Sequence, residues 1–305
     1  MRKKIAIIGV PMDFGQLLRG VDMGPAAVRY TGLVPMLRTL GHTVEDLGDI
    51  RIPVRDCEAD ICSDGRILTP DKHRYVNEIT RVCESIYTVG KKAVNKNQFP
   101  LFIGGDHSIA VGTVSAVTDP APSGLIWIDA HADFNTPDTS PSGNIHGMPL
   151  AGLIGEGHES LVNIGRPGAK ILPENVVLIG QRDIDPEERA RLRQHGMTVF
   201  TMRDIDEQGI SAIANKTLMK FVHLKRIHLT LDMDALDPVE APGVGTPVPG
   251  GITYREAHLL METLADSGKL ASMDLVEINP ILDEANKTAK LAVELTLSAL
   301  GKSIL

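Results

Sequence analysis

The sequence of 305 residues predicts an α/β protein with a mostly parallel central sheet and helices on both of its faces. Two observations carry this prediction. Short apolar segments of strand length alternate along the chain with longer segments of helical periodicity. Three of the apolar segments end abruptly in acidic or histidine-containing motifs, as strands do at a binding edge. Because no linker-like stretch interrupts the alternation, we expect a single domain over residues 1–305.

Local composition places the individual elements. The first strand is predicted where a short apolar run ends at Pro11, and the first helix begins at Pro25, since proline is favoured in a first helical turn. The polar residues 51–73 are interpreted as a long surface loop. Strands are expected at residues 5–10, 41–50, 100–103, 124–128, 176–179, 197–200, 227–231 and 271–276. Further helices are expected at residues 71–97, 186–195, 211–221, 253–266 and 286–300.

Composition excludes several classes of partner. A formal net charge of -8 argues against nucleic acid or an anionic membrane as the main partner. No apolar stretch approaches the roughly 20 residues that span a bilayer. The three cysteines, Cys57, Cys62 and Cys83, show no C-x-x-C spacing, so neither a disulfide framework nor a thiolate zinc site is expected. We therefore expect a protein of the reducing cytoplasm.

Candidate metal ligands follow three of the predicted strands. Asp129-Ala-His-Ala-Asp133 follows residues 124–128, Asp232-Met-Asp234 follows residues 227–231, and His107 lies just after residues 100–103. If the first motif continues its strand, alternation projects its three ligands to one face and its alanines to the other. The ligand set is His107, Asp129, His131, Asp133, Asp232 and Asp234. The carboxyl ends of parallel strands share one edge, so we expect these side chains to converge there.

This donor set favours two divalent cations. Four carboxylates at close quarters repel one another unless cations offset their charge. Ligation rich in carboxylates and free of thiolates suits Mn²⁺ better than Zn²⁺, although cobalt or nickel also fits. The alternative, in which each Asp caps a turn and each His packs, suits a lone motif better than three. Asp106 is expected to orient its loop, and the glycine-rich residues 243–251 lack a P-loop pattern and are interpreted as an active-site rim.

The motifs resemble those of the ureohydrolase family, in particular of its arginase branch. The resemblance rests on Gly104–Ser108, Asp129–Pro137, Ser142–Gly147 and Asp232–Pro238, and shorter matches extend it over nearly the whole chain. It implies a three-layer α/β/α domain, a binuclear centre with two Mn²⁺ per subunit, and assembly into homotrimers or homohexamers. Phe134, Pro141 and Met233 depart from the expected pattern.

The same resemblance implies a reaction. Hydroxide bridging the two metals would attack the guanidinium carbon of L-arginine and release L-ornithine and urea. Asp133 would ligate metal and orient the hydroxide, and Glu277, which follows the last predicted strand, would hold the guanidinium group. His146 would deliver a proton to the leaving amine, a role suited to an imidazole near neutral pH.

The far end of the substrate is assigned to other polar residues. Asn135, Ser142 and Asn144 match positions that bind the α-carboxylate, and Asp185 matches the acid that receives the α-ammonium group. Ser140 has a hydroxyl suited to the same carboxylate. Agmatine lacks the carboxylate and guanidinobutyrate lacks the ammonium group, so L-arginine is the expected substrate. The alternatives are an agmatinase or other guanidino-compound ureohydrolase and, from a different class, a metal-binding module without turnover.

Overall fold

The computed structural model describes residues 2–55, 74–119 and 121–303. Most of the predicted loop at residues 51–73, the first residues of the helix expected at 71–97, and Cys57 and Cys62 lie outside the described residues. Within the described residues, the predicted helix begins at Val76.

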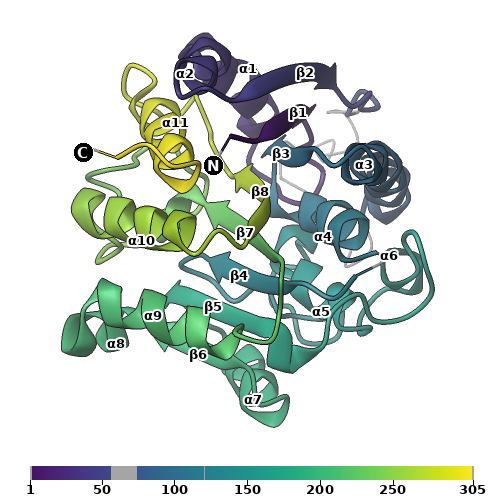
Figure 1. The fold of residues 1–305 in the computed structure, drawn as a ribbon. Helices are drawn as coiled ribbons and strands as arrows, with labels where there is room; N and C mark the ends of the chain where they lie inside the picture. The colour runs from purple at the N-terminus through teal and green to yellow at the C-terminus, as the bar shows by residue number, and fades with distance from the viewer. Residues whose placement is uncertain (1, 56–73, 120, 304–305) are drawn as a thin grey trace.

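Eight strands form one sheet in which every neighbouring pair is parallel (Figure 1). The strands are β1 Lys4–Val10, β2 Thr43–Asp49, β3 Phe99–Gly104, β4 Gly124–Ile128, β5 Val176–Gln181, β6 Thr198–Thr201, β7 Ile227–Asp232 and β8 Leu270–Val276. Their order is β2-β1-β3-β8-β7-β4-β5-β6. All eight were predicted, and the expected α/β class with a parallel central sheet is confirmed.

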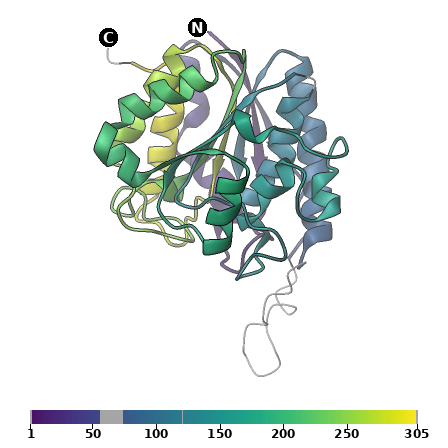
Figure 2. The ribbon, with the colours of Figure 1, turned by 90° about the horizontal axis from the view of Figure 1, so that it is seen from below.

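Helices cover both faces of the sheet (Figure 2). One layer contains α1 Gly24–Tyr30, α2 Leu33–Thr39, α8 Met202–Gln208, α9 Ile210–Lys220, α10 Tyr254–Asp266 and α11 Lys287–Ala299. The other contains α3 Val76–Asn95, α4 Ala110–Thr118, α5 Pro149–Leu153, α6 Glu159–Val162 and α7 Pro186–Gln194. The molecule is therefore a three-layer α/β/α structure. None of the described helices is long and apolar enough to cross a membrane.

Strand alternation divides the hydrophobic core between the two layers. In β4, Leu125 and Trp127 pack into the cluster that includes α4 and α5 side chains, whereas Ile126 and Ile128 pack into the cluster beneath α9, α10 and α11. Both pairs are buried, which explains why this strand is apolar at every position rather than at alternate ones.

The strand order places the functional loops together. β3, β8, β7 and β4 are consecutive in the sheet, although they are distant in sequence. Because all are parallel, the loops that follow them leave the same edge. The residues after these strands are therefore neighbours in space.

Candidate active site

Three loops at the carboxyl edge supply the predicted metal ligands. His107 opens a short 3-10 turn after β3, Asp129 follows β4, and Asp232 ends β7. Asp106 caps the first of these turns, because its side chain accepts from the backbone N–H groups of Ser108 (3.0 Å) and Gly15 (2.9 Å). Its expected role in orienting the loop agrees with these contacts.

The local geometry of the Asp129–Asp133 segment differs from the prediction. β4 ends at Ile128, so the motif is not a strand, and Asp133 adopts a left-handed backbone with φ of 50°. The expected strand alternation across the three ligands is wrong. The chain bends after β4 instead, and Ala130 and Ala132 are both buried.

The ligand atoms form two groups that share one carboxylate. His107 Nδ1 lies 3.0 Å from Asp129 Oδ2, 2.9 Å from Asp133 Oδ2 and 3.2 Å from Asp232 Oδ2. On the other side of Asp129, His131 Nδ1 lies 3.0 Å from Asp234 Oδ2 and 3.4 Å from Asp129 Oδ1. His107, Asp129 and Asp133 form one candidate metal-binding group, and Asp129, His131 and Asp234 form a second.

A buried nitrogen shows that this donor set fits a cation. His107 Nδ1 is buried and has no hydrogen-bond partner among the described residues, although three carboxylate oxygens surround it. A buried polar atom without a partner is costly. A divalent cation held by this nitrogen and the carboxylates would satisfy all of them at once.

The charges of the site also favour bound cations. Burial, together with the Asp129 charge, raises the pKa of Asp133 to about 6. Burial and the neighbouring Asp234 raise the pKa of Asp232 well above its ordinary value. Burial would lower the pKa of His131, but Asp129 and Asp234 outweigh it and raise that pKa to about 12. The site is thus short of positive charge, which divalent ions supply.

Residues that the sequence analysis did not identify hold the ligands in place. His107 Nε2 lies 2.9 Å from Thr230 Oγ1, and the His107 ring stacks on Trp127. Trp127 Nε1 donates to Asp129 Oδ2 at 3.0 Å, and Thr246 Oγ1 donates to Asp234 Oδ2 at 2.9 Å. Such contacts fix the orientation of metal ligands.

His146 and Glu277 form a pair beside the ligand cluster. His146 Nδ1 lies 3.0 Å from Glu277 Oε1, which also accepts from the backbone N–H of His107 at 2.9 Å. Gln16 Nε2 donates to Glu277 Oε2 at 2.8 Å. Burial alone would raise the pKa of Glu277, but His146 lowers it; burial alone would lower the pKa of His146, but Glu277 raises it to about 9. Glu277 therefore favours the protonated form of His146.

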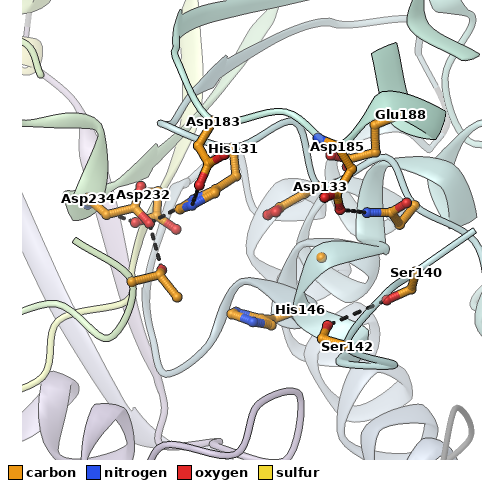
Figure 3. A pocket seen from close by; sticks show the side chains of 13 residues that line it. His131, Asp133, Ser140, Ser142, His146, Asp183, Asp185, Glu188, Asp232 and Asp234 are labelled. Carbon is orange, nitrogen blue, oxygen red and sulfur yellow. Dashed lines mark hydrogen bonds and ion pairs between the residues drawn. The ribbon is translucent and has the colours of Figure 1, made fainter. Parts of the chain in front are cut away.

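A polar cavity of about 160 Å³ opens beside the ligands. Figure 3 shows His146, Ser140 and Ser142 on one side of it and Asp133, Asp185 and Glu188 on the other. Asn135 also lines the cavity and donates through Nδ2 to Asp185 Oδ2 at 2.9 Å.

Not every predicted residue lines this cavity. Asn144 lies in a neighbouring recess beside Gln16 and Arg55, and Glu277 is buried at 1% exposure beyond His146. Thr246 lines the cavity, as expected if residues 243–251 form its rim.

Two of the departures from the family pattern are accommodated by the core. Phe134 is fully buried in the cluster that contains Trp127 and Leu150. Met233 is fully buried in the cluster on the opposite face of the sheet. Both bulky side chains therefore leave the ligand cluster free, and neither lines the cavity.

The fold and the site define an α/β enzyme whose candidate metal centre lies at the carboxyl edge of a parallel sheet. The arginase family model matches residues 3–301. The chain is 49% identical over 306 residues to an arginase from Bacillus subtilis (strain 168), with 100% of both chains covered. The chain therefore belongs to the arginase family of hydrolases.

Solved structures agree with this assignment. The native structure of arginase from Bacillus caldovelox matches with a TM-score of 0.93 at 46% identity, covering 99% of this chain and 100% of that one. The structure of Entamoeba histolytica arginase in complex with L-ornithine matches with a TM-score of 0.88 at 32% identity, covering 99% of each chain.

Proposed function

We propose that this chain hydrolyses L-arginine to L-ornithine and urea with two Mn²⁺ ions per subunit. The observation that carries the proposal is the arrangement around Asp129. Its two oxygens lie in two separate ligand groups, one of which contains the buried, unpartnered His107 Nδ1. A carboxylate shared in this way is the expected bridge of a binuclear centre. Similarity to arginases over the full length supports the same conclusion.

The residues divide between the two ions. His107, Asp129, Asp133 and Asp232 would hold one ion, and Asp129, His131 and Asp234, with Asp232 beside them, would hold the other. Oxygen-rich ligation without thiolates favours manganese. When bound, such a pair of cations supplies Lewis acidity and lowers the pKa of a shared water toward neutrality.

The side chains around the cavity provide the remaining functions. Asp133 faces both the ligand cluster and the cavity, where its carboxylate can orient a water against the substrate. His146, held by Glu277, which favours its protonated form, can donate a proton to the departing amine. Glu277 accepts from His146, from the His107 backbone and from Gln16, so of the roughly four acceptor sites of a carboxylate one, on Oε2, remains for a guanidinium N–H.

Arginine matches the polar groups at the cavity wall. Asn135 and Ser142 offer an amide and a hydroxyl donor for an α-carboxylate, and Asn144, in the neighbouring recess, donates its backbone N–H to Ser142 Oγ. Asp185 offers the negative charge for an α-ammonium group. Assembly of three or six copies in the cytoplasm, without nucleic-acid or membrane partners, stays a prediction.

A panel of guanidino compounds tests the proposal. Urea release is measured with Mn²⁺ on L-arginine, agmatine and guanidinobutyrate. Each missing charged group forfeits hydrogen bonds worth about 1.5–3 kcal/mol, so kcat/KM should fall roughly 10- to 100-fold for each poorer substrate. Asp185→Asn should narrow the gap between arginine and guanidinobutyrate, because only arginine uses that carboxylate. Comparable rates on agmatine and arginine would overturn the proposal in favour of an agmatinase.

A further inference from the structure

A second cavity, of about 600 Å³, is lined by residues of β5, β6, α7 and α8 and of the loops between them. β6 is the edge strand of the sheet (Figure 1). The second cavity shares no lining residue with the active-site cavity. Residues 181–189 form the wall between the two, since Arg182, Ile184 and Arg189 line the second cavity while Asp183, Asp185 and Glu188 line the first. Its volume is within the range of small-ligand sites.

Gln181, which lines the second cavity, has a buried acceptor without a partner. Gln181 is fully buried, its Nε2 donates to the backbone oxygen of Asp129 at 3.0 Å, and its Oε1 has no hydrogen-bond partner among the described residues. An unpartnered buried amide oxygen is costly, and a ligand with a hydrogen-bond donor would remove that cost.

The rest of the cavity has two further properties. Its walls are apolar, with Leu192 and Met197 buried and Val199 and Met202 half-buried. Its exposed residues Arg189, Arg193 and Arg203 are all cationic, and no acidic residue lines it.

Few acidic side chains of the protein pair with these three arginines. Arg203 pairs with the exposed Glu207 one helical turn away, and Arg189 makes only a 3.4 Å contact with the Ile184 oxygen. Arg193 has no ion-pair partner among the residues that the structure describes. Guanidinium groups in this setting favour an anionic group on the ligand, above all a carboxylate or phosphate.

We propose that this cavity is an effector site for a small carboxylate that has an apolar body and a terminal hydrogen-bond donor. The carboxylate binds the arginines, the body lies against Leu192 and Met202, and the donor reaches Gln181 Oε1. This proposal does not depend on the substrate of the active site.

The floor of the cavity connects it to the metal ligands. Gln181 holds the Asp129 backbone, and Arg182 donates to the backbone oxygens of Asp234 (2.7 Å) and Leu236 (3.2 Å). A donor bound to Gln181 Oε1 polarises the amide and strengthens its bond to Asp129. Binding of the effector should therefore stabilise the two loops that contain Asp129 and Asp234 and should tighten metal binding.

Calorimetric titration of the Mn²⁺-loaded protein tests the site with three matched probes. The probe ω-hydroxyhexanoate has both polar ends, hexanoate lacks the donor, and hexanediol lacks the carboxylate. Because each end makes one strong contact, we expect the complete probe to bind at least about 10-fold more tightly than either control. Equal affinities of the three probes, or no binding by the complete one, would overturn the proposal.

Variants separate this site from the active site. Arg189→Gln with Arg193→Gln should weaken binding of ω-hydroxyhexanoate about 10-fold or more, while Arg81→Gln, an exposed arginine on α3 in the opposite layer, should not. Met202→Trp fills the cavity and should abolish binding without removing a charge. Undiminished binding to both the double variant and Met202→Trp would mean that the probe binds elsewhere, which contradicts the proposal.

A Mn²⁺ titration tests the effector role. Saturating ω-hydroxyhexanoate should lower the dissociation constant of Mn²⁺ about 5-fold or more, the usual scale of coupling between two sites. The double arginine variant should lose this effect. A Mn²⁺ affinity that stays the same with bound probe would overturn the effector role.

Discussion

Two acidic residues of the site adopt a backbone conformation that is rare for residues other than glycine. Asp133 has φ of 50° and Glu277 has φ of 63°. Such left-handed residues cost roughly 1 kcal/mol or more and gather at functional sites. Glycine would relieve the strain but would remove the carboxylate, so the chain retains strained acids where their charge is needed.

The Thr246 hydroxyl provides a residue-scale prediction. Its Oγ1 donates to Asp234 Oδ2, and contacts of this kind contribute about 10- to 100-fold to metal affinity. Thr246→Val keeps the side-chain shape but removes the donor, so the dissociation constant of Mn²⁺ should rise about 10-fold or more. Titration with a metal-sensing dye measures it.

Thr246→Ser is the matched control, because it loses a methyl group but keeps the hydroxyl. It should bind Mn²⁺ with nearly the affinity of the unchanged protein. If both variants lose affinity equally, packing rather than the hydrogen bond supports Asp234.

Single residues also show how far the sequence predicts the site. The ligands were predictable because they belong to short motifs at the carboxyl ends of apolar strands, as the motif that begins at Asp129 follows β4. Thr230 and Trp127 could have been found, since each lies two residues before a ligand on the same strand face. Gln16 could not, because its contact with Glu277 joins residues 261 positions apart.

At the scale of elements, α4, α5, α6 and α8 were not predicted, and α4 shows one physical reason. Every residue of Ala110–Thr118 is buried, between the sheet and the helices α3 and α5. A helix that is covered on all sides has no polar face, so it has no amphipathic period to recognise. The eight strands were predicted because a short apolar run between turns suffices for a buried strand.

The contact between α3 and α4 gives a prediction for stability. A Cβ at Gly112 would lie 2.7 Å from the backbone oxygen of Cys83 and 2.9 Å from Ile86 Cβ. Gly112→Ala must push the two helices apart, which should lower the free energy of unfolding by about 1–3 kcal/mol. Denaturant titration measures this loss.

Gly152→Ala in α5 is the control for that measurement. The nearest atom to its Cβ would be Val111 Cγ2 at 4.0 Å, so the new methyl meets no clash. Alanine is the better helix former by about 0.5–1 kcal/mol, and this variant should be unchanged or slightly stabilised. A loss in Gly152→Ala as large as in Gly112→Ala would show that helix spacing is not the cause.

His42 links the amino-terminal strands to α11 and predicts a pH dependence. Its Nδ1 accepts from the backbone N–H of Lys3, and its Nε2 lies 3.0 Å from the Leu300 oxygen. Burial lowers the pKa of His42 below its ordinary value of 6.5, although the Leu300 contact raises it. As pH falls through 6.5, the unfolded chain takes up a proton that the folded protein refuses, so this contribution to stability is lost in acid.

His42→Gln should flatten that dependence. Glutamine can accept from Lys3 and donate to Leu300 without titrating, so the free energy of unfolding should fall less between about pH 7.5 and 5.5. His223→Gln, which changes an exposed histidine, should keep the original slope. An unaltered slope in His42→Gln would show that His42 is not the group responsible.

At the scale of the whole molecule, the order of the sheet creates the site. β3, β8, β7 and β4 lie side by side, so ligands from positions 107 to 234 and the acid at 277 gather at one edge. No local segment contains the complete set. The sequence predicted which residues gather, because parallel strands align their carboxyl ends, but the strand order was not predictable from local patterns.

The central claim is that Asp129 bridges two manganese ions. Anomalous diffraction at the manganese absorption edge, from crystals of the Mn²⁺-replete protein, tests it most directly. We predict two anomalous peaks per subunit, one beside His107 and one beside His131, with Asp129 between them. A single peak, or no peak next to Asp129, would contradict the account.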